Sequence, residues 1–149
     1  MCSSDLEKPV PRLIRLVRNR WLLKAVCRTT RAFVRGANML SRPRLTKPIR
    51  TAFEAPYSTA DRREAIETFV SDIPLDGRHP SRAALDEVAT GLDRLAEVPV
   101  LLLWGPADPV FNTVYLRDLA ARLPQAEIHR LEGASHLVAE DVRVAPAVF

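Results

Sequence analysis

The sequence predicts an α/β fold, in which a mostly helical region over residues 8–98 precedes a βαβ part of a doubly wound parallel sheet over residues 99–149. Before residue 99, apolar side chains recur at helical spacing between prolines and glycines. From residue 99 on, two short apolar runs flank one amphipathic stretch. Strand, helix and strand in this order are typical of one crossover between parallel strands.

The composition indicates a single folded domain of ordinary size. The chain has 149 residues, of which 47% are hydrophobic, close to the globular norm. No apolar run approaches the roughly 18 residues of a membrane span, and the first residues lack the features of a secretory signal. Cys2 and Cys27 stand in no metal-like spacing, so we expect both thiols to be reduced. The sequence thus predicts a cytoplasmic protein with no metal and no cofactor.

Charge is unevenly distributed along the chain. Residues 1–50 hold thirteen Lys and Arg against two acids, whereas residues 51–149 hold nine against sixteen, so the two parts carry +11 and −7. Such a basic block could bind nucleic acid or an anionic membrane surface. The other interpretation, which we favour, is a solvated helical face that packs against an acidic surface.

The first expected helices lie in the basic block. Apolar and basic residues interleave from Val10 to Leu40, which indicates two amphipathic helices with a break near Asn19 and Arg20. Pro43 and Pro48 then predict a turn-rich segment.

Two more helices are expected before residue 99. Ser58 and Asp61 have the spacing of a capping box, and the helix that follows has an apolar face with Ile66. Ser81 can cap the next helix, which Pro99 prevents from continuing.

Two strands and a helix are expected after Pro99. Val100–Trp104 is an unbroken apolar run that ends at Gly105, as expected of a strand buried on both faces of a parallel sheet. An amphipathic helix ends before Pro124, and residues 126–131 alternate as the second strand. We expect Trp104 to pack at its strand end and His129 to face solvent.

Two polar residues follow the predicted strands. Asp108 lies four residues after Trp104, and His136 lies five residues after Leu131. The carboxyl ends of parallel strands share one edge of the sheet, where such folds bind ligands, so we expect the two side chains within hydrogen-bond reach. An aspartate can fix the imidazole tautomer while the other ring nitrogen acts as a general base. The simpler alternative is a surface hydrogen bond without catalysis.

Segments around both residues resemble a known family. Val100–Pro109 and Leu131–His136 are similar to the acid and histidine segments of α/β-hydrolases, whose triad order is nucleophile, acid, histidine. Residues 55–58, 69–75 and 79–81 resemble the cap and cap exit of haloalkane dehalogenase-like members, which implies a cap region over residues 8–98. Within that group the chain is most similar to the β-lactone decarboxylases of bacterial olefin biosynthesis, which some bacteria fuse to an AMP-dependent ligase.

The family also has features that this sequence lacks. Its members carry a nucleophile elbow, Gly-x-Ser-x-Gly or an Asp variant, and a His-Gly oxyanion loop. No two of the five glycines lie four apart, and no histidine precedes a glycine. We therefore expect a truncated α/β-hydrolase, the C-terminal half, inactive alone. The resemblance implies a parent that attacks an ester, haloalkane, epoxide or β-lactone through Ser or Asp.

Both ends of the chain are expected to be cut. Residues 144–149 resemble the opening of the family's last helix. Residues 1–7 are expected to be a non-native leader, because residues 2–6 back-translate to a common sequencing-adapter string. Other codons at those positions would remove this idea.

Three apolar residues beside the polar pair are expected to line a substrate pocket, with ordinary packing as the alternative: Val110, Phe111 and Leu137. The expected partners are a small-molecule substrate of the parent, a fused or partner ligase domain, and other copies of the fragment. Nucleic acid is not expected, since the aromatic interleaving of single-strand binders is missing. A basic binding module and a non-catalytic hydrolase relative are the competing hypotheses.

Overall fold

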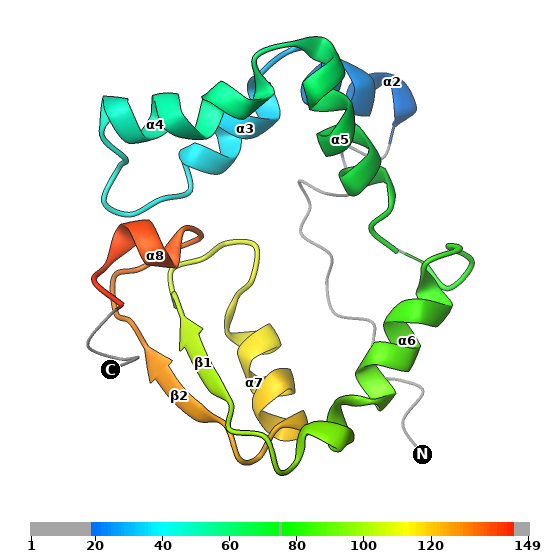
Figure 1. Ribbon diagram of the computed structural model, residues 1–149, viewed down its shortest axis with the longest axis vertical. Coiled ribbons are helices and arrows are strands. Elements are labelled where there is room, and N and C mark those ends of the chain that lie inside the picture. Colours follow the sequence, from blue (N-terminus) through cyan, green and yellow to red (C-terminus); the bar gives the residue numbers. More distant parts are fainter. Residues whose placement is uncertain (1–18, 75, 145–149) are drawn as a thin grey trace.

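The computed structural model describes residues 19–74 and 76–144. Its elements in chain order are α2 (Arg20–Leu23), the π-helix η1 (Lys24–Thr29), α3 (Ala32–Asn38), α4 (Lys47–Glu54), the 3₁₀ helix η2 (Ala55–Tyr57), α5 (Ala60–Ser71), α6 (Arg82–Thr90), the 3₁₀ helix η3 (Leu92–Leu95), β1 (Leu101–Trp104), α7 (Thr113–Arg122), β2 (Glu127–Arg130) and α8 (Val138–Asp141). Figure 1 shows α2–α5 at one end of the molecule and the two strands at the other, with α8 between them. The predicted leader over residues 1–7 lies outside the described residues.

The helical end is organised around a small apolar core. Leu23, Cys27, Val34 and Ile66 are buried together, so α2, η1, α3 and α5 contribute to one apolar cluster. The break near Asn19 lies where α2 begins, and the Asn19 side chain accepts the Trp21 amide at 3.0 Å. The helix expected before that break falls on residues that the structure does not describe.

A second interruption in this region was not predicted from the sequence. The helical run stops at Thr30 and resumes at Ala32. The Thr30 hydroxyl donates to the Val26 carbonyl at 3.3 Å and accepts the Ala32 amide at 3.2 Å. A threonine that bonds to nearby backbone in this way competes with the helix ladder, which explains the break.

One buried cation joins the helices of this end. The Arg63 guanidinium donates to the carbonyls of Arg28 at 2.7 Å, Tyr57 at 3.0 Å, Ser58 at 3.1 Å and Thr29 at 3.3 Å. Its side chain is buried, and these four acceptors provide the hydrogen bonds that a buried charge requires. Arg63 therefore ties η1 to the start of α5.

Part of the basic block faces acids of the chain's own helices. Arg28 lies 3.3 Å from Glu64 on α5, and Arg35 lies 3.2 Å from Glu54 on α4. Surface pairs of this kind stabilise little. They nevertheless show that these arginines have acidic neighbours within the chain.

Two local expectations were wrong, and a third was right only in the position of the residue. The turn-rich prediction fails from Lys47, because Pro48 sits in the first turn of α4, where a proline needs no amide partner. The capping box on Ser58 is also wrong, since Thr59 caps α5 and accepts the Arg62 amide at 3.4 Å. Ser81 precedes α6 but makes no capping bond, because its hydroxyl donates to Asp72 instead.

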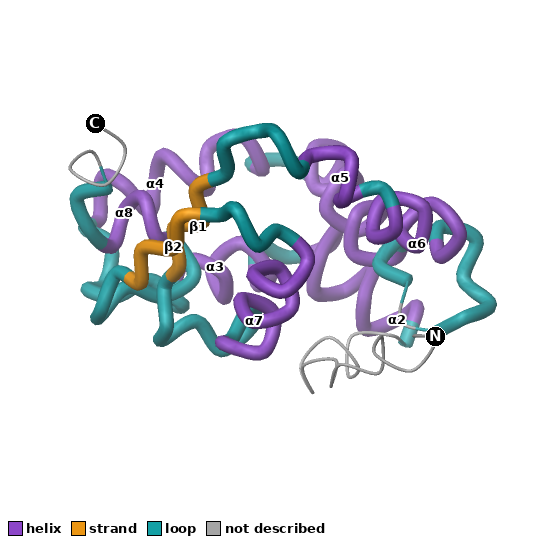
Figure 2. Tube along the Cα trace, turned by 90° about the horizontal axis from the view of Figure 1, so that it is seen from below, coloured by secondary structure: helices purple, strands orange, loops and turns teal. Residues whose placement is uncertain are grey.

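The predicted βαβ unit is confirmed. β1 and β2 are parallel, with Leu101 opposite Glu127 and Trp104 opposite Arg130. Helix α7 connects them and runs beside the pair (Figure 2), and its Leu116 is buried. Asn112 caps this helix by accepting the Val114 amide at 2.9 Å.

The expectation that β1 is buried on both faces was wrong for this chain. Leu101 is 38% exposed, and Ile128 on the neighbouring strand is 42% exposed. The described sheet has only two strands, so neither strand is enclosed by neighbours on both edges. Among the described helices, none has the length and apolar character that crossing a membrane requires.

Candidate active site

Asp108 lies in the loop after β1 and is buried, with 8% of its surface exposed. Its Oδ1 accepts the Val110 amide at 2.7 Å, which holds the carboxylate within its own turn. Its Oδ2 lies 2.9 Å from Nδ1 of His136 in the loop after β2. The structure thus brings together the two residues that the strand ends predicted to be close.

The contact defines the imidazole tautomer. A carboxylate only accepts hydrogen bonds, so Nδ1 of His136 carries the proton and donates it to Asp108. In the described part of the chain, Nε2 has no hydrogen-bond partner. Its lone pair is therefore free to accept a proton.

Close backbone contacts hold the two loops side by side. Ala107 donates its amide to the Ala134 carbonyl at 3.1 Å, and the Ser135 hydroxyl donates to the Ala107 carbonyl at 3.2 Å. A Cβ at Gly105 would lie 3.0 Å from the Ala134 oxygen and still nearer the Ser135 oxygen. Glycine is required there by this close approach. At Gly133 the reason is different, because its φ of 87° is a conformation that other residues rarely adopt.

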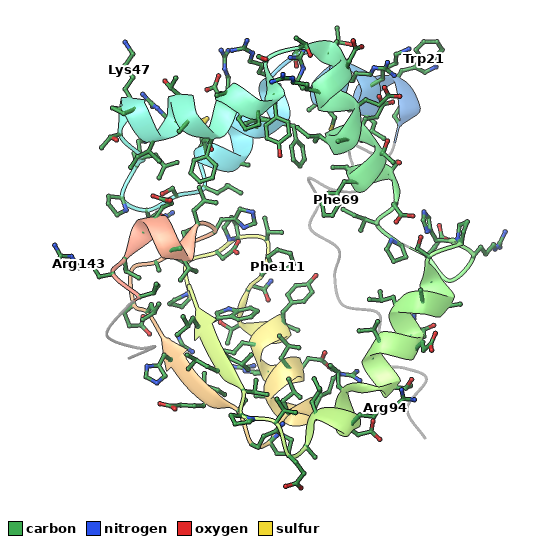
Figure 3. The ribbon with its side chains drawn as sticks, viewed as in Figure 1. Trp21, Lys47, Phe69, Arg94, Phe111 and Arg143 are labelled. Carbon is green, nitrogen blue, oxygen red and sulfur yellow. The ribbon has the colours of Figure 1, made fainter. Side chains whose placement is uncertain are left out.

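Phe111 forms an apolar wall beside the histidine. Its ring stacks on that of His136, with centroids 5.9 Å apart and planes 11° apart. It also forms a T-shaped pair with Tyr115, with ring centroids 5.7 Å apart. Phe111 is 51% exposed and lies in the loop between β1 and α7 (Figure 3). Val110 and Leu137 are half-buried neighbours of the polar pair in sequence. A pocket role for the three stays a prediction.

The other two histidines and Trp104 have contacts of their own. His129 pairs with Glu127 on β2 at 2.5 Å. His79 closes its own loop, since its Nδ1 accepts the Ser81 amide at 3.2 Å and its Nε2 lies 3.2 Å from the Ser71 carbonyl. The Nε1 of Trp104, half-buried at its strand end, has no partner among the described residues.

Sequence reasoning missed a buried carboxylate next to the site. Asp141 at the end of α8 accepts the Ser135 amide at 2.6 Å and the Arg42 amide at 2.8 Å. It also accepts the Ser41 hydroxyl. In the sequence, only its position five residues after His136 connected Asp141 with the site. No neighbouring residue identified Ser41 or Arg42 as its partners.

Cys27, the cysteine that the structure describes, lies in the apolar core of the helical end. Burial, and to a smaller extent the charge of Glu67, raise the pKa of Cys27 from 9.0 to about 11, so this thiol is protonated and unreactive at neutral pH. In the residues that the structure describes, no three His, Cys, Asp or Glu side chains are grouped as metal ligands.

Comparisons with known proteins give two kinds of relatives, although no protein-family model matches the chain. The chain is 34% identical over 136 residues to the cis-3-alkyl-4-alkyloxetan-2-one decarboxylase of Xanthomonas campestris pathovar campestris, covering 91% of this chain and 45% of that protein. It is 31% identical over 136 residues to the enzyme of the same name from Shewanella oneidensis, covering 90% and 43%. The chain thus spans less than half the length of these relatives.

Solved structures of haloalkane dehalogenases have a similar fold. The enzyme from Bradyrhizobium elkani superposes with a TM-score of 0.77 at 22% identity, over 87% of this chain and 45% of that one. The enzyme from Agrobacterium tumefaciens superposes with a TM-score of 0.73 at 20% identity, over 91% and 47%. At these identities the likeness concerns the fold.

Proposed function

We propose that this chain, which has the fold of the C-terminal half of an α/β-hydrolase, provides the acid and the histidine of a nucleophile–histidine–acid triad. The fold itself agrees with the class predicted from the sequence. In the proposal Asp108 is the acid and His136 is the base. The observation that carries it is the 2.9 Å hydrogen bond between Oδ2 of Asp108 and Nδ1 of His136.

The arrangement suits proton transfer at the free edge of the imidazole. Because Asp108 accepts the Nδ1 proton, Nε2 can take a proton from a nucleophile or from a water molecule. The imidazolium that forms is then stabilised by the carboxylate. Asp108 is buried, so water screens this interaction less than it would at the surface.

The nucleophile and the oxyanion donors come from outside this sequence. The chain has no Gly-x-Ser-x-Gly and no His-Gly pair, and hydrolases of this fold need both kinds of group. We therefore propose that the chain is inactive alone and acts within a parent that contributes Ser or Asp. The helices before β1 are its cap region in this proposal.

A β-lactone is the substrate class that we propose for the parent. The relatives at 34% and 31% identity are named for an oxetan-2-one with two alkyl groups, which is a strained cyclic ester with an electrophilic carbonyl. Phe111, stacked on His136, places apolar surface next to the base. Alkyl groups of the lactone would lie against this ring, with Val110 and Leu137 as further wall residues.

The test is a chimaera that restores the missing half. The segment of the Xanthomonas decarboxylase that this chain matches is replaced by this chain, and the product is assayed with a cis-3,4-dialkyl-β-lactone. We expect turnover that Asp108→Asn lowers by about four orders of magnitude, because an amide cannot stabilise the imidazolium. His136→Ala should have an effect of similar size, and His129→Ala, on β2 and paired with Glu127, should have little.

Three results would count against the proposal. A folded chimaera without turnover would support the competing hypothesis of a non-catalytic relative. Turnover that survives His136→Ala would exclude this histidine as the base. Hydrolysis of esters, haloalkanes or epoxides but not of the lactone would leave the triad in place and refute the substrate class.

A further inference from the structure

A second buried carboxylate lies five residues after the proposed histidine. Asp141 is 7% exposed and belongs to α8, the short helix that follows the histidine loop. Its two oxygens accept three donors, which are the amides of Ser135 and Arg42 and the hydroxyl of Ser41. The structure shows no ion pair to Asp141 within residues 19–74 and 76–144. These three hydrogen bonds therefore compensate for burying its charge.

The first of these donors belongs to the residue before His136. The Ser135 amide lies 2.6 Å from Oδ2 of Asp141, which fixes the backbone where the histidine loop turns into α8. The Ser135 hydroxyl then reaches the carbonyl of Ala107, the residue before Asp108. Asp141 is thus linked through one residue to both members of the proposed pair.

The other two donors come from the helical end of the molecule. Ser41 and Arg42 lie in the segment between α3 and α4, next to α8 (Figure 1). Ser41 is 2% exposed. Its hydroxyl has a single proton, which it donates either to Asp141 or to the Pro43 carbonyl at 3.0 Å. Ser41 and Arg42 reach Asp141 only when the helical end is docked, so this docking helps to hold the histidine loop.

We infer that Asp141 is a positioning residue for His136, which couples the orientation of the imidazole to the docking of residues 41–42. The inference rests on the proposed function, because it assigns Asp141 to the same site. Within the described residues, Asp141 makes no hydrogen bond to Nδ1 or Nε2 of the imidazole. It acts through the backbone of Ser135.

The chemistry of the anchor predicts the effect of an isosteric change. In Asp141→Asn one oxygen becomes an NH₂ group, so that a donor faces donors and at least one of the three hydrogen bonds is lost. Ser41→Ala removes only the hydroxyl and keeps the carboxylate with its two amide donors. Asp61→Asn, at the exposed start of α5, is the matched control.

The experiment measures the imidazole tautomer by NMR in the ¹⁵N-labelled 149-residue chain. The shifts of the two ring nitrogens report the fraction of His136 with its proton on Nδ1. We expect this form to dominate in the wild type and to be reduced severalfold in Asp141→Asn. Ser41→Ala should give a smaller shift in the same direction, and Asp61→Asn should give none. In the chimaera, Asp141→Asn should lower kcat about 100-fold with little change in KM, as expected of a misplaced base.

Asp108→Asn distinguishes a failure of the proposed function from a failure of the positioning role of Asp141. If it leaves the His136 tautomer unchanged, the Asp108–His136 pair itself fails, and with it the proposed function. If Asp108→Asn changes the tautomer and neither Asp141→Asn nor Ser41→Ala does, the positioning role alone is refuted. Should Asp141→Asn unfold the chain, Ser41→Ala decides, because it leaves the buried charge and both amide bonds intact.

Discussion

Gly105 determines how closely the loops that carry Asp108 and His136 can approach. The space where its Cβ would stand is taken by the backbone oxygens of Ala134 and Ser135. Backbone atoms cannot rotate out of the way as the end of a side chain can. The identity of this residue is therefore dictated by packing between the loops. In the sequence it marked only the end of an apolar run.

We predict that Gly105→Ala destabilises the fold by about 1–3 kcal/mol, the usual cost of overpacking a filled site. Gly36→Ala is the control, since nothing lies within 4 Å of its Cβ position and it sits inside α3. There alanine should stabilise by about 0.5–1 kcal/mol. Urea unfolding of the two variants should give midpoint shifts of opposite sign, and equal shifts would contradict the close approach.

The raised pKa of Cys27 predicts both reactivity and pH dependence. In a Cys2→Ser background, native Cys27 should react slowly with iodoacetamide at pH 8 and quickly in urea. The folded pKa of about 11 lies above the ordinary 9.0, so this contribution to stability is complete below pH 9 and is lost as the pH rises through 11. Cys27→Ala should remove that alkaline component. Rapid labelling of the native chain would refute the burial.

At the scale of residues, the sequence predicted the Asp108–His136 pair but not the hydrogen bonds of Asp141 beside it. Asp108 and His136 could be located because each follows a strand, and parallel strands deliver their carboxyl ends to one edge. Ser41 and Asp141 could not be paired from the sequence, since their hydrogen bond spans 100 positions. No local pattern encodes such a contact.

At the scale of elements, Arg63 is the main polar contact of the helical end. It joins the carbonyls around Thr29 to those around Tyr57, and no carboxylate among the described residues pairs with it. A buried arginine of this kind acts as a clamp between η1 and α5.

We predict that Arg63→Met costs about 2–4 kcal/mol of unfolding free energy, because buried carbonyls lose their donors. Arg62→Met, at an exposed neighbouring position of the same helix, should change stability by less than about 0.5 kcal/mol. Thermal melts followed by circular dichroism provide the comparison. Similar melting temperatures for both variants would show that the clamp does not stabilise the helical end.

Element prediction succeeded where periodicity was strong and failed where side chains acted locally. The βαβ unit was recognisable because an unbroken apolar run and an alternating run flank α7. Helix α4 was missed because Pro48 was interpreted as a breaker, although its position in the first turn permits it. The break at Thr30 depends on one hydroxyl, which apolar periodicity does not register.

At the scale of the whole molecule, large apolar side chains remain exposed. Trp21 is 83% exposed, Met39 and Phe69 are each 71% exposed, and Val88 is 63% exposed. Figure 3 shows Trp21 at the outer edge of the helical end. Both strands of the sheet also have one edge without a described neighbour. Exposed apolar surface and open edges favour association.

We predict that the purified chain self-associates. Light scattering coupled to size-exclusion chromatography should give a mass above 16.7 kDa for the eluted protein, increasing with concentration. Dilution and Trp21→Lys should each lower this mass if the exposed apolar groups are the cause. A monomer at all concentrations with a sharp cooperative melt would be the contrary result.

The anchor between Ser41 and Asp141 also has a consequence for the order of folding. The helices of residues 20–71 and the βαβ unit form from contacts that are close in sequence, whereas this hydrogen bond joins positions 100 residues apart. Closing a chain loop of that length costs about 4 kcal/mol of entropy before any contact is gained. The anchor should therefore form last, when two preassembled parts meet. In a refolding experiment with pulsed hydrogen exchange, the Arg42 amide, which Asp141 accepts across 99 positions, is expected to gain protection after the amides of α5 and β2.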